Sequence, residues 1–385
     1  MDKSASLTIE NKSLDDREND LQIGFTIEEM ATRAEALLKS IGLVKDFAPI
    51  VYLIGHGSSS VNNPHYAAYD CGACSGRAGS VNSRTMCFMA NHPKVRAILK
   101  SKGIDIPGTT QFVGGLHDTS RDEVMFFDEN LLSKQNLENH NKNEVVFYNA
   151  LDLNAKERSR RFELINSRQT AEKIHEEVKL RSVSLFEPRP ELNHATNALC
   201  VIGRRELTKS LYLDRRCFLN SYDYSIDPEG TILLGIMKPI GPVCGGINLE
   251  YFFSRTDNQK LGAGTKLPHN VMGLFGVANG IDGDLRPGLP SQMIEVHDPV
   301  RLMVIVEHFP EVLHNVVRKL PEVYEWYINE WISLIAIHPE TRELFVLKKG
   351  EFVPYHPLRY EVQTVSNLAP FFESEEENLP VLVLS

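Results

Sequence analysis

Residues 48–58 of the chain read APIVYLIGHGS, and this stretch decides how the fold is interpreted. Its first seven residues are largely apolar and include β-branched side chains, a pattern typical of a buried strand. Gly55 and Gly57 follow directly and permit a loop at the end of that strand. In open α/β sheets, ligands bind beside the loops that follow the carboxyl ends of strands. We therefore expect a ligand site next to His56, which lies between the two glycines.

The residues around this strand predict alternating helices and strands. Residues 26–41 predict a helix that begins with a capping box, in which Thr26 is the N-cap and Glu29 lies three residues later. Further along, residues 92–102 predict a helix, and residues 110–116 and 123–127 predict strands. This order of elements is typical of an α/β fold.

Beyond this region the pattern changes twice. Residues 129–145 are polar without periodicity and predict an exposed insertion, whereas residues 155–181 predict one long, charged, solvent-facing helix. A second α/β region follows, with strands expected at 197–202, 217–222 and 301–307 and an amphipathic helix at 311–331. The expected organisation is a mobile polar leader (1–22), a first α/β region that carries His56 (23–150), a charged helix and connector (151–196), a second α/β region (197–350) and a tail (351–385).

Composition excludes several classes of protein. The 385 residues are 42% hydrophobic and 24% charged, which is close to ordinary folded proteins and excludes extended disorder. The formal net charge is −10 without a long basic stripe, so we expect no nucleic-acid partner. The first residues lack the pattern of a secretion signal, and the longest apolar runs fall far short of the roughly 20 residues of a membrane-spanning helix. We therefore expect a folded chain that does not itself span a membrane.

The strongest chemical signal is the grouping of His56 with Cys71, Cys74 and Cys87, because imidazole and thiolate are the preferred ligands of zinc. Two arrangements remain open. In one, all four side chains close a structural zinc site. In the other, His56 and Cys71 form half of a catalytic site whose remaining ligands lie elsewhere, and one position stays open for water.

Other candidate residues have simpler explanations. We expect His65, His92, His117 and His269 to be hydrogen-bonding or core side chains. Thiol redox chemistry at Cys71-x-x-Cys74 is disfavoured because the pair lies in a glycine-rich loop without a thioredoxin-like strand-to-helix setting.

A series of motifs, taken together, resembles the DabA family, the soluble subunit of energy-coupled inorganic-carbon pumps. The resemblance extends from about residue 25 to about residue 350 and corresponds to the C-terminal part of that family. The matching motifs are GHGS (55–58), NNP (62–64), YDCGAC (69–74), NSR (82–84), FVGGLHDT (112–119), GAGTK (262–266), HNV (269–271) and GDLRPGLP (283–290).

The resemblance implies a core similar to β-carbonic anhydrases, with a mixed or parallel sheet flanked by helices, and an additional α/β half towards the C-terminus. In the family, zinc is held by two cysteines, one aspartate and one histidine. Carried over by motif, the histidine is His56 and one cysteine is Cys71, whereas Cys74 is not an assigned ligand. The other two ligands come from a Cys-x-Asp-x-Arg motif that this chain lacks, since none of its cysteines is followed two residues later by aspartate.

The hypothesis from the sequence is that this chain is the C-terminal half of a split DabA-like subunit. A separate polypeptide with Cys-x-Asp-x-Arg would complete the zinc site, and the assembled subunit would hydrate CO2 to bicarbonate. The resemblance implies a DabB-like proton-translocating membrane subunit as partner, with this chain bound peripherally at the cytoplasmic face of the inner membrane. The alternatives are a non-catalytic scaffold with a structural His/Cys zinc site, or an inactive truncated remnant.

Overall fold

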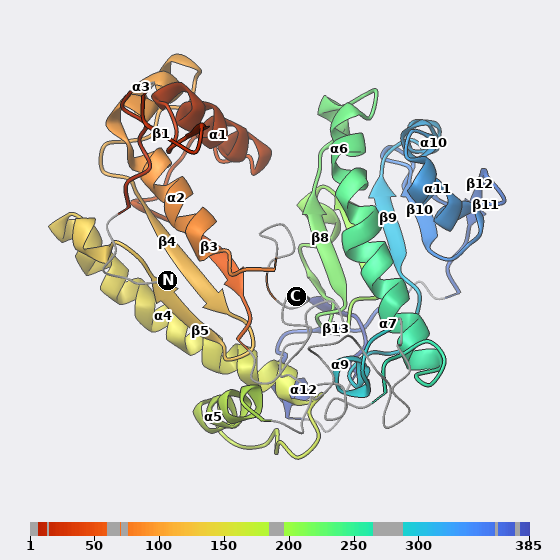
Figure 1. Cartoon of the computed structure of the whole chain (residues 1–385). Helices are drawn as coiled ribbons and strands as arrows, with labels where there is room; N and C mark the ends of the chain where they lie inside the picture. The colour runs from red at the N-terminus through yellow and green to blue at the C-terminus, as the bar shows by residue number, and fades with distance from the viewer. Residues whose placement is uncertain are drawn as a thin grey trace. The chain divides into compact units, whose positions relative to one another are not determined.

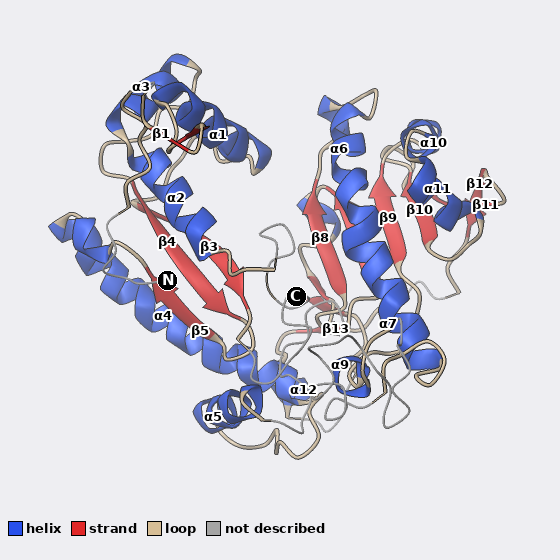
Figure 2. Cartoon of the chain, in the orientation of Figure 1, coloured by secondary structure: helices blue, strands red, loops and turns tan. Residues whose placement is uncertain are grey.

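The computed structural model describes residues 7–13, 15–59, 70, 76–184, 196–264, 288–358, 361–373 and 378–385. The described part is a mixture of helices and sheets, which confirms the α/β class (Figures 1 and 2). The chain forms two compact units. Unit 1 consists of residues 1–61, 65–156 and 170–183, and unit 2 of residues 62–64, 157–169 and 184–385.

Unit 1 is built on a three-stranded sheet in the order β3-β4-β5. Strands β3 (Ile50–Gly57) and β4 (Gln111–Asp118) are parallel, and β5 (Glu123–Phe126) is antiparallel to β4. Helices α1 (Ile27–Ser40), α2 (Ser80–Asn91) and α3 (Pro93–Ser101) lie on one side of this sheet, and α4 (Lys134–Ser159) lies on the other (Figure 1). Strand β3, predicted from the opening motif, is therefore packed on both faces.

Side chains of β3 alternate between two hydrophobic clusters. Val51 and Leu53 pack into the cluster formed with α1, α2 and α3, whereas Tyr52 packs into the cluster with Phe126 and with Phe147 of α4. Because both faces are covered, the strand can be apolar throughout, which is why its sequence shows no polar alternation.

The predicted start of the first helix is confirmed. Thr26 is the N-cap of α1, and its Oγ1 accepts a hydrogen bond from Glu29 N at 3.2 Å. In return, the Glu29 carboxylate accepts from Thr26 N at 2.9 Å. Residues 17–22, in the region expected to be a leader, form the short antiparallel strands β1 (Arg17–Glu18) and β2 (Leu21–Gln22).

The predictions for residues 129–181 are confirmed only in part, because helices are present but their bounds differ. The expected insertion contains η3 (Glu129–Leu131) and the first half of α4, and the expected single long helix is the end of α4 followed by α5 (Ala171–Ser182). The buried positions of α4 do recur at helical spacing, but Asn136 and His140 occupy two of them. Since polar residues form part of the buried stripe, a search for apolar periodicity does not detect it.

Unit 2 contains a six-stranded sheet in the order β12-β11-β10-β9-β6-β8. Strands β8, β6, β9 and β10 are neighbours in that order and are parallel. Strand β11 is antiparallel to β10, and β12 is antiparallel to β11. Their bounds are β6 (Leu199–Gly203), β8 (Cys217–Ser221), β9 (Met303–Glu307), β10 (Ser333–Ile337), β11 (Leu344–Lys348) and β12 (Glu351–Tyr355). The strands expected at 197–202, 217–222 and 301–307 are thus confirmed with small shifts.

Smaller elements complete unit 2. A second sheet has the order β13-β14-β7. The helix expected at 311–331 is two helices, because Pro321 cannot continue a helix and instead starts the second one. The bounds are β7 (Leu211–Tyr212), β13 (Thr364–Val365), β14 (Leu382–Leu384), η4 (Arg205–Leu207), η5 (Tyr224–Ile226), α9 (Ser291–Ile294), α10 (Pro310–Arg318), α11 (Pro321–Ile328) and α12 (Ala369–Phe372).

One helical segment of unit 2 is long and apolar enough, by length and composition, to cross a membrane. It runs from Thr231 to Thr256 through α6 (Thr231–Ile240), the π-helical turn η6 (Gly241–Gly246) and α7 (Ile247–Thr256). Of its most apolar window, 44% is buried, and Leu233, Met237 and Leu249 belong to the hydrophobic core of unit 2. A buried core helix that is apolar on most sides has the same length and composition as a membrane-spanning helix.

Candidate functional site

The candidate site begins at the carboxyl ends of β3 and β4, where His56 is the second-to-last residue of its strand. His56 is paired in register with His117 of β4. Since strand side chains alternate, His56 and His117 lie on the face that carries Tyr52 and α4, while Gly55 and Gly57 face α2. The strand therefore presents the His56 imidazole on the α4 side of the sheet.

The glycines are required because helix α2 packs directly on the strands. A Cβ atom at Gly55 would lie 2.4 Å from the carbonyl oxygen of Gly79, which is the N-cap of α2. At Gly114 of β4, a Cβ atom would lie 2.9 Å from the Cα atom of Arg84. Gly79 N also donates to the carbonyl oxygen of His56 at 2.7 Å. This close packing fixes the backbone that carries the imidazole.

Hydrogen bonds hold Ser58 and Ser59, the first two residues after β3. Ser58 N donates to Asp70 Oδ1 at 2.9 Å, and the hydroxyls of Ser58 and Ser120 are 2.6 Å apart. Ser59 N donates to Asp118 Oδ1 at 3.1 Å. Asp70 is only 6% exposed, and its Oδ2 has no hydrogen-bond partner within the part of the chain that the structure describes. Buried polar atoms are nearly always paired, so this carboxylate oxygen calls for a cation or donor.

His117 and His92 are hydrogen-bonding side chains, as predicted. His117 Nε2 lies 3.2 Å from Asp122 Oδ1, and Asp122 also accepts from Asn154 of α4. His92 Nε2 lies 3.4 Å from a carboxylate oxygen of Glu10. His65 and His269 lie outside the described residues.

The predicted cysteine ligands divide into two groups. Cys71 and Cys74 lie outside the described residues. Cys87 lies on α2 inside the hydrophobic core of unit 1, and burial raises the pKa of its thiol to about 12. A thiol with that environment is typical of an inert core side chain, which disfavours Cys87 as a zinc ligand.

A cavity of about 670 Å³ lies between α2, β4 and η3. The Arg84 side chain, which lines it, forms a bidentate ion pair with Asp128 at 2.7 and 2.6 Å. Cys87 and His92 also line this cavity. It is on the α2 side of the sheet, whereas the register places His56 on the opposite face.

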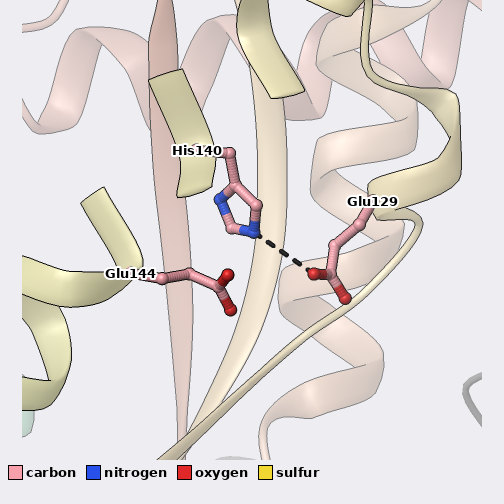
Figure 3. A group of neighbouring side chains, drawn as sticks. All are labelled: Glu129, His140 and Glu144. Atoms are coloured by element: carbon pink, nitrogen blue, oxygen red, sulfur yellow. Dashed lines mark hydrogen bonds and ion pairs between the residues drawn. The ribbon is translucent and has the colours of Figure 1, made fainter. Parts of the chain in front are cut away.

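A second group of potential ligands has no counterpart among the predicted site residues. Glu129, His140 and Glu144 each offer one ligand atom, and these atoms all lie within 4.8 Å of one another (Figure 3). Among the described residues this is the one such group of three, and no metal is identified in it. Its sequence signal is the four-residue spacing of His140 and Glu144, which becomes informative only when the segment is recognised as a helix.

Comparison with known proteins identifies one family. The family model DabA, described as "Probable inorganic carbon transporter subunit DabA", matches residues 2–332. A protein of that name from Azotobacter vinelandii is 66% identical over 385 residues, covering 100% of this chain and 46% of the relative. One from Nitrosospira multiformis is 60% identical over 397 residues, covering 99% of this chain and 43% of the relative.

The chain spans less than half the length of both relatives. No solved structure matches it. The mixed α/β architecture is therefore established from this structure alone, and the likeness of its core to β-carbonic anhydrases stays a prediction.

Proposed function

Because this chain belongs to the DabA family of probable inorganic carbon transporter subunits, we propose that it is the C-terminal half of a zinc-binding subunit that takes part in inorganic carbon transport. His56 and Cys71 supply two of the four zinc ligands. A second polypeptide with a Cys-x-Asp-x-Arg segment supplies the other two. When bound, zinc supplies Lewis-acid activation of water for the hydration of CO2 to bicarbonate.

The hydrogen bond from Ser58 N to Asp70 Oδ1 is the observation that carries this proposal. Asp70 directly precedes Cys71, and Ser58 lies two residues after His56. This contact therefore supports convergence of residues 56 and 71, although fourteen residues separate them in the sequence. Asp70 Oδ2 is buried and has no hydrogen-bond partner among the described residues, which supports a nearby cation or donor at this edge of the sheet.

The position of β3 in the sheet supports a contribution from another polypeptide. β3 pairs with β4 alone, and no other described strand pairs with its second edge. Long apolar strands at an open edge invite pairing with a further strand. A parallel strand added there would end beside His56, because parallel strands end at one edge of the sheet. A Cys-x-Asp-x-Arg segment at its end would complete the ligand set.

The proposed assembly includes a membrane partner. A DabB-like proton-translocating subunit would couple CO2 hydration to an energy source. This chain would bind it peripherally, at the cytoplasmic face of the inner membrane. The description of the relatives as transporter subunits supports a membrane-associated complex.

Zinc content of the purified full chain, alone and after co-expression with the N-terminal half of a full-length relative, tests the proposal. We expect zinc that depends on His56 to be bound tightly only in the co-expressed complex. His56→Ala and Cys71→Ser each abolish that zinc and the CO2 hydration of the complex. Cys74→Ser is the matched control and leaves both unchanged.

Two results contradict this proposal. If the His56→Ala complex keeps its full zinc content and full CO2 hydration, His56 is not a zinc ligand. Zinc bound tightly by the chain alone and lost in both Cys71→Ser and Cys74→Ser supports the structural scaffold instead, because a closed set of four ligands needs no second polypeptide.

A further inference from the structure

We propose that Glu129, His140 and Glu144 form a second metal site, which binds a divalent transition-metal ion such as Zn²⁺ and is separate from the His56 site. Glu129 comes from η3, and His140 and Glu144 come from α4, which lies on the side of the unit 1 sheet opposite α2. Figure 3 shows the two carboxylates on either side of the imidazole edge, directed toward one another. The proposal concerns residues that the family resemblance does not assign.

The backbone holds the three ligands in place before any ion binds. His140 and Glu144 are one helical turn apart on α4 and therefore lie on the same face. Glu129 follows Asp128, whose carboxylate is clamped by Arg84 of α2. This ion pair fixes the start of η3 and with it the approach of Glu129, whose Oε1 is 3.3 Å from His140 Nε2.

The imidazole of His140 is fully buried and cannot rotate freely. Its Nδ1 lies 2.9 Å from the Tyr52 hydroxyl, and Asn143 Nδ2 donates to the same hydroxyl at 3.2 Å. The Phe126 ring packs edge-on against the imidazole at a centroid distance of 4.9 Å. Metal-binding histidines typically use one ring nitrogen for the ion and the other for a supporting hydrogen bond. Tyr52 provides that support and leaves Nε2 to face the carboxylates.

Charge favours a cation between the carboxylates. Glu129 and Glu144 bring two negative charges within 4.8 Å of each other beside an imidazole. The side-chain carboxylate of Glu144 makes no hydrogen bond or ion pair with a described residue, and Glu144 is half-buried. A divalent ion would offset the repulsion between the two carboxylates. One nitrogen and two carboxylate oxygens are a ligand set that Zn²⁺ accepts, and three protein ligands leave a position for water.

The competing explanation is that His140 only forms a hydrogen bond with Glu129 and that no metal binds. Glu144 distinguishes this explanation from a metal site. In a metal-free relay, Nε2–H donates to Glu129 and Glu144 has no function. In a metal site, Glu144 is a ligand, and neutralising it weakens binding without removing any hydrogen bond of the metal-free state. Glu144→Gln therefore tests the proposal without disturbing the core.

The experiment uses the full chain carrying His56→Ala and Cys71→Ser, so that the site of the proposed function is absent. After treatment with a chelator, binding of Zn²⁺ alone is measured by isothermal titration calorimetry. We expect one Zn²⁺ per chain, a loss of affinity of at least tenfold in Glu144→Gln and in Glu129→Gln, and no change in Glu138→Gln. Glu138 is an exposed glutamate on the same helix and serves as the matched control.

Because the double variant lacks His56 and Cys71, its zinc binding reports on the second site alone and does not depend on the proposed function. Retention of full affinity in Glu144→Gln, or equal losses in Glu144→Gln and Glu138→Gln, overturns the second site. Co²⁺ provides an independent readout, since this site has no sulfur ligand and its complex must lack the thiolate-to-cobalt charge-transfer absorption expected of a site that contains Cys71. A Co²⁺ complex of the double variant that shows this absorption also overturns the proposal.

Discussion

At the scale of single residues, the approach of α2 to β3 leaves no space for a side chain at Gly55. A Cβ atom there would lie 2.4 Å from backbone atoms of Gly79, which cannot move aside as a flexible side chain could. We predict that Gly55→Ala destabilises unit 1 by roughly 1–3 kcal/mol. Urea unfolding followed by circular dichroism measures this change. Gly108→Ala is the control, because a Cβ atom at Gly108 meets nothing within 4 Å; equal effects at both positions would contradict the packing argument.

Glu307, at the end of β9, makes the stability of unit 2 dependent on pH. It is fully buried. Burial alone would raise the pKa of its carboxyl group, but side-chain and backbone hydrogen bonds from Arg204 outweigh burial and lower that pKa. A lowered folded-state pKa means that the stabilisation is present above the unfolded-state pKa of about 4.3 and is lost as the pH falls through the folded-state value.

We therefore predict that Glu307→Gln lowers the free energy of unfolding by about 2 kcal/mol at pH 7. The difference between the variant and the parent chain should shrink as the pH falls below about 4, since the unfolded parent chain then takes up a proton at Glu307 that the folded chain takes up only at lower pH. Chemical unfolding across a pH series measures both quantities. A difference that stays constant down to pH 3 would show that the charge of Glu307 is not the cause.

The structural position of His56 can be predicted from the local sequence, whereas that of His140 cannot. His56 follows an apolar run and lies between two glycines, so its place at a strand end is predictable from local pattern. His140 lies in a polar stretch, and its burial depends on Tyr52 and Phe126, which are distant in the sequence. Tertiary contacts of this kind are invisible to a search along the chain.

At the scale of secondary-structure elements, the capping box of α1 permits a direct test. Thr26 Oγ1 accepts from Glu29 N, and removal of the hydroxyl leaves a helix-terminal N–H without its partner. We predict that Thr26→Ala destabilises unit 1 by about 1 kcal/mol in thermal or urea unfolding. Thr32→Ala, within the same helix, is the control and should be neutral or stabilising by a few tenths of a kcal/mol, since alanine is the better helix former. A larger loss at Thr32 than at Thr26 would contradict this assignment of the cap.

Elements with a local signal were predictable, and elements set by tertiary contacts were not. The strands β3, β4, β6 and β9 follow from apolar runs, and α1 follows from its capping box. Helix α4 does not, because its buried stripe includes Asn136 and His140. The π-helical turn η6 joins α6 to α7 past Pro239, and so forms a longer helix than the broken apolar runs of that region suggest.

At the scale of the whole molecule, each unit has its own hydrophobic core. Met237 of α6 is fully buried in the core of unit 2, and Cys87 and Leu53 belong to that of unit 1. We predict that Met237→Ala costs about 2–5 kcal/mol. Hydrogen exchange should then show faster exchange in β6 and β9, with β3 and β4 unchanged. Equal acceleration in both sets of strands would mean that the two cores unfold as one.

The division of the chain between the units has a consequence for biosynthesis. Residues 157–169 belong to unit 2, yet residues 170–183, which include α5, return to unit 1. His175 of α5 contacts Asp152 and the carbonyl oxygen of Arg121. During translation, unit 1 therefore cannot complete its folding until about residue 183 has left the ribosomal exit tunnel. A pause in translation before that point would expose a partly assembled unit to chaperones and proteases.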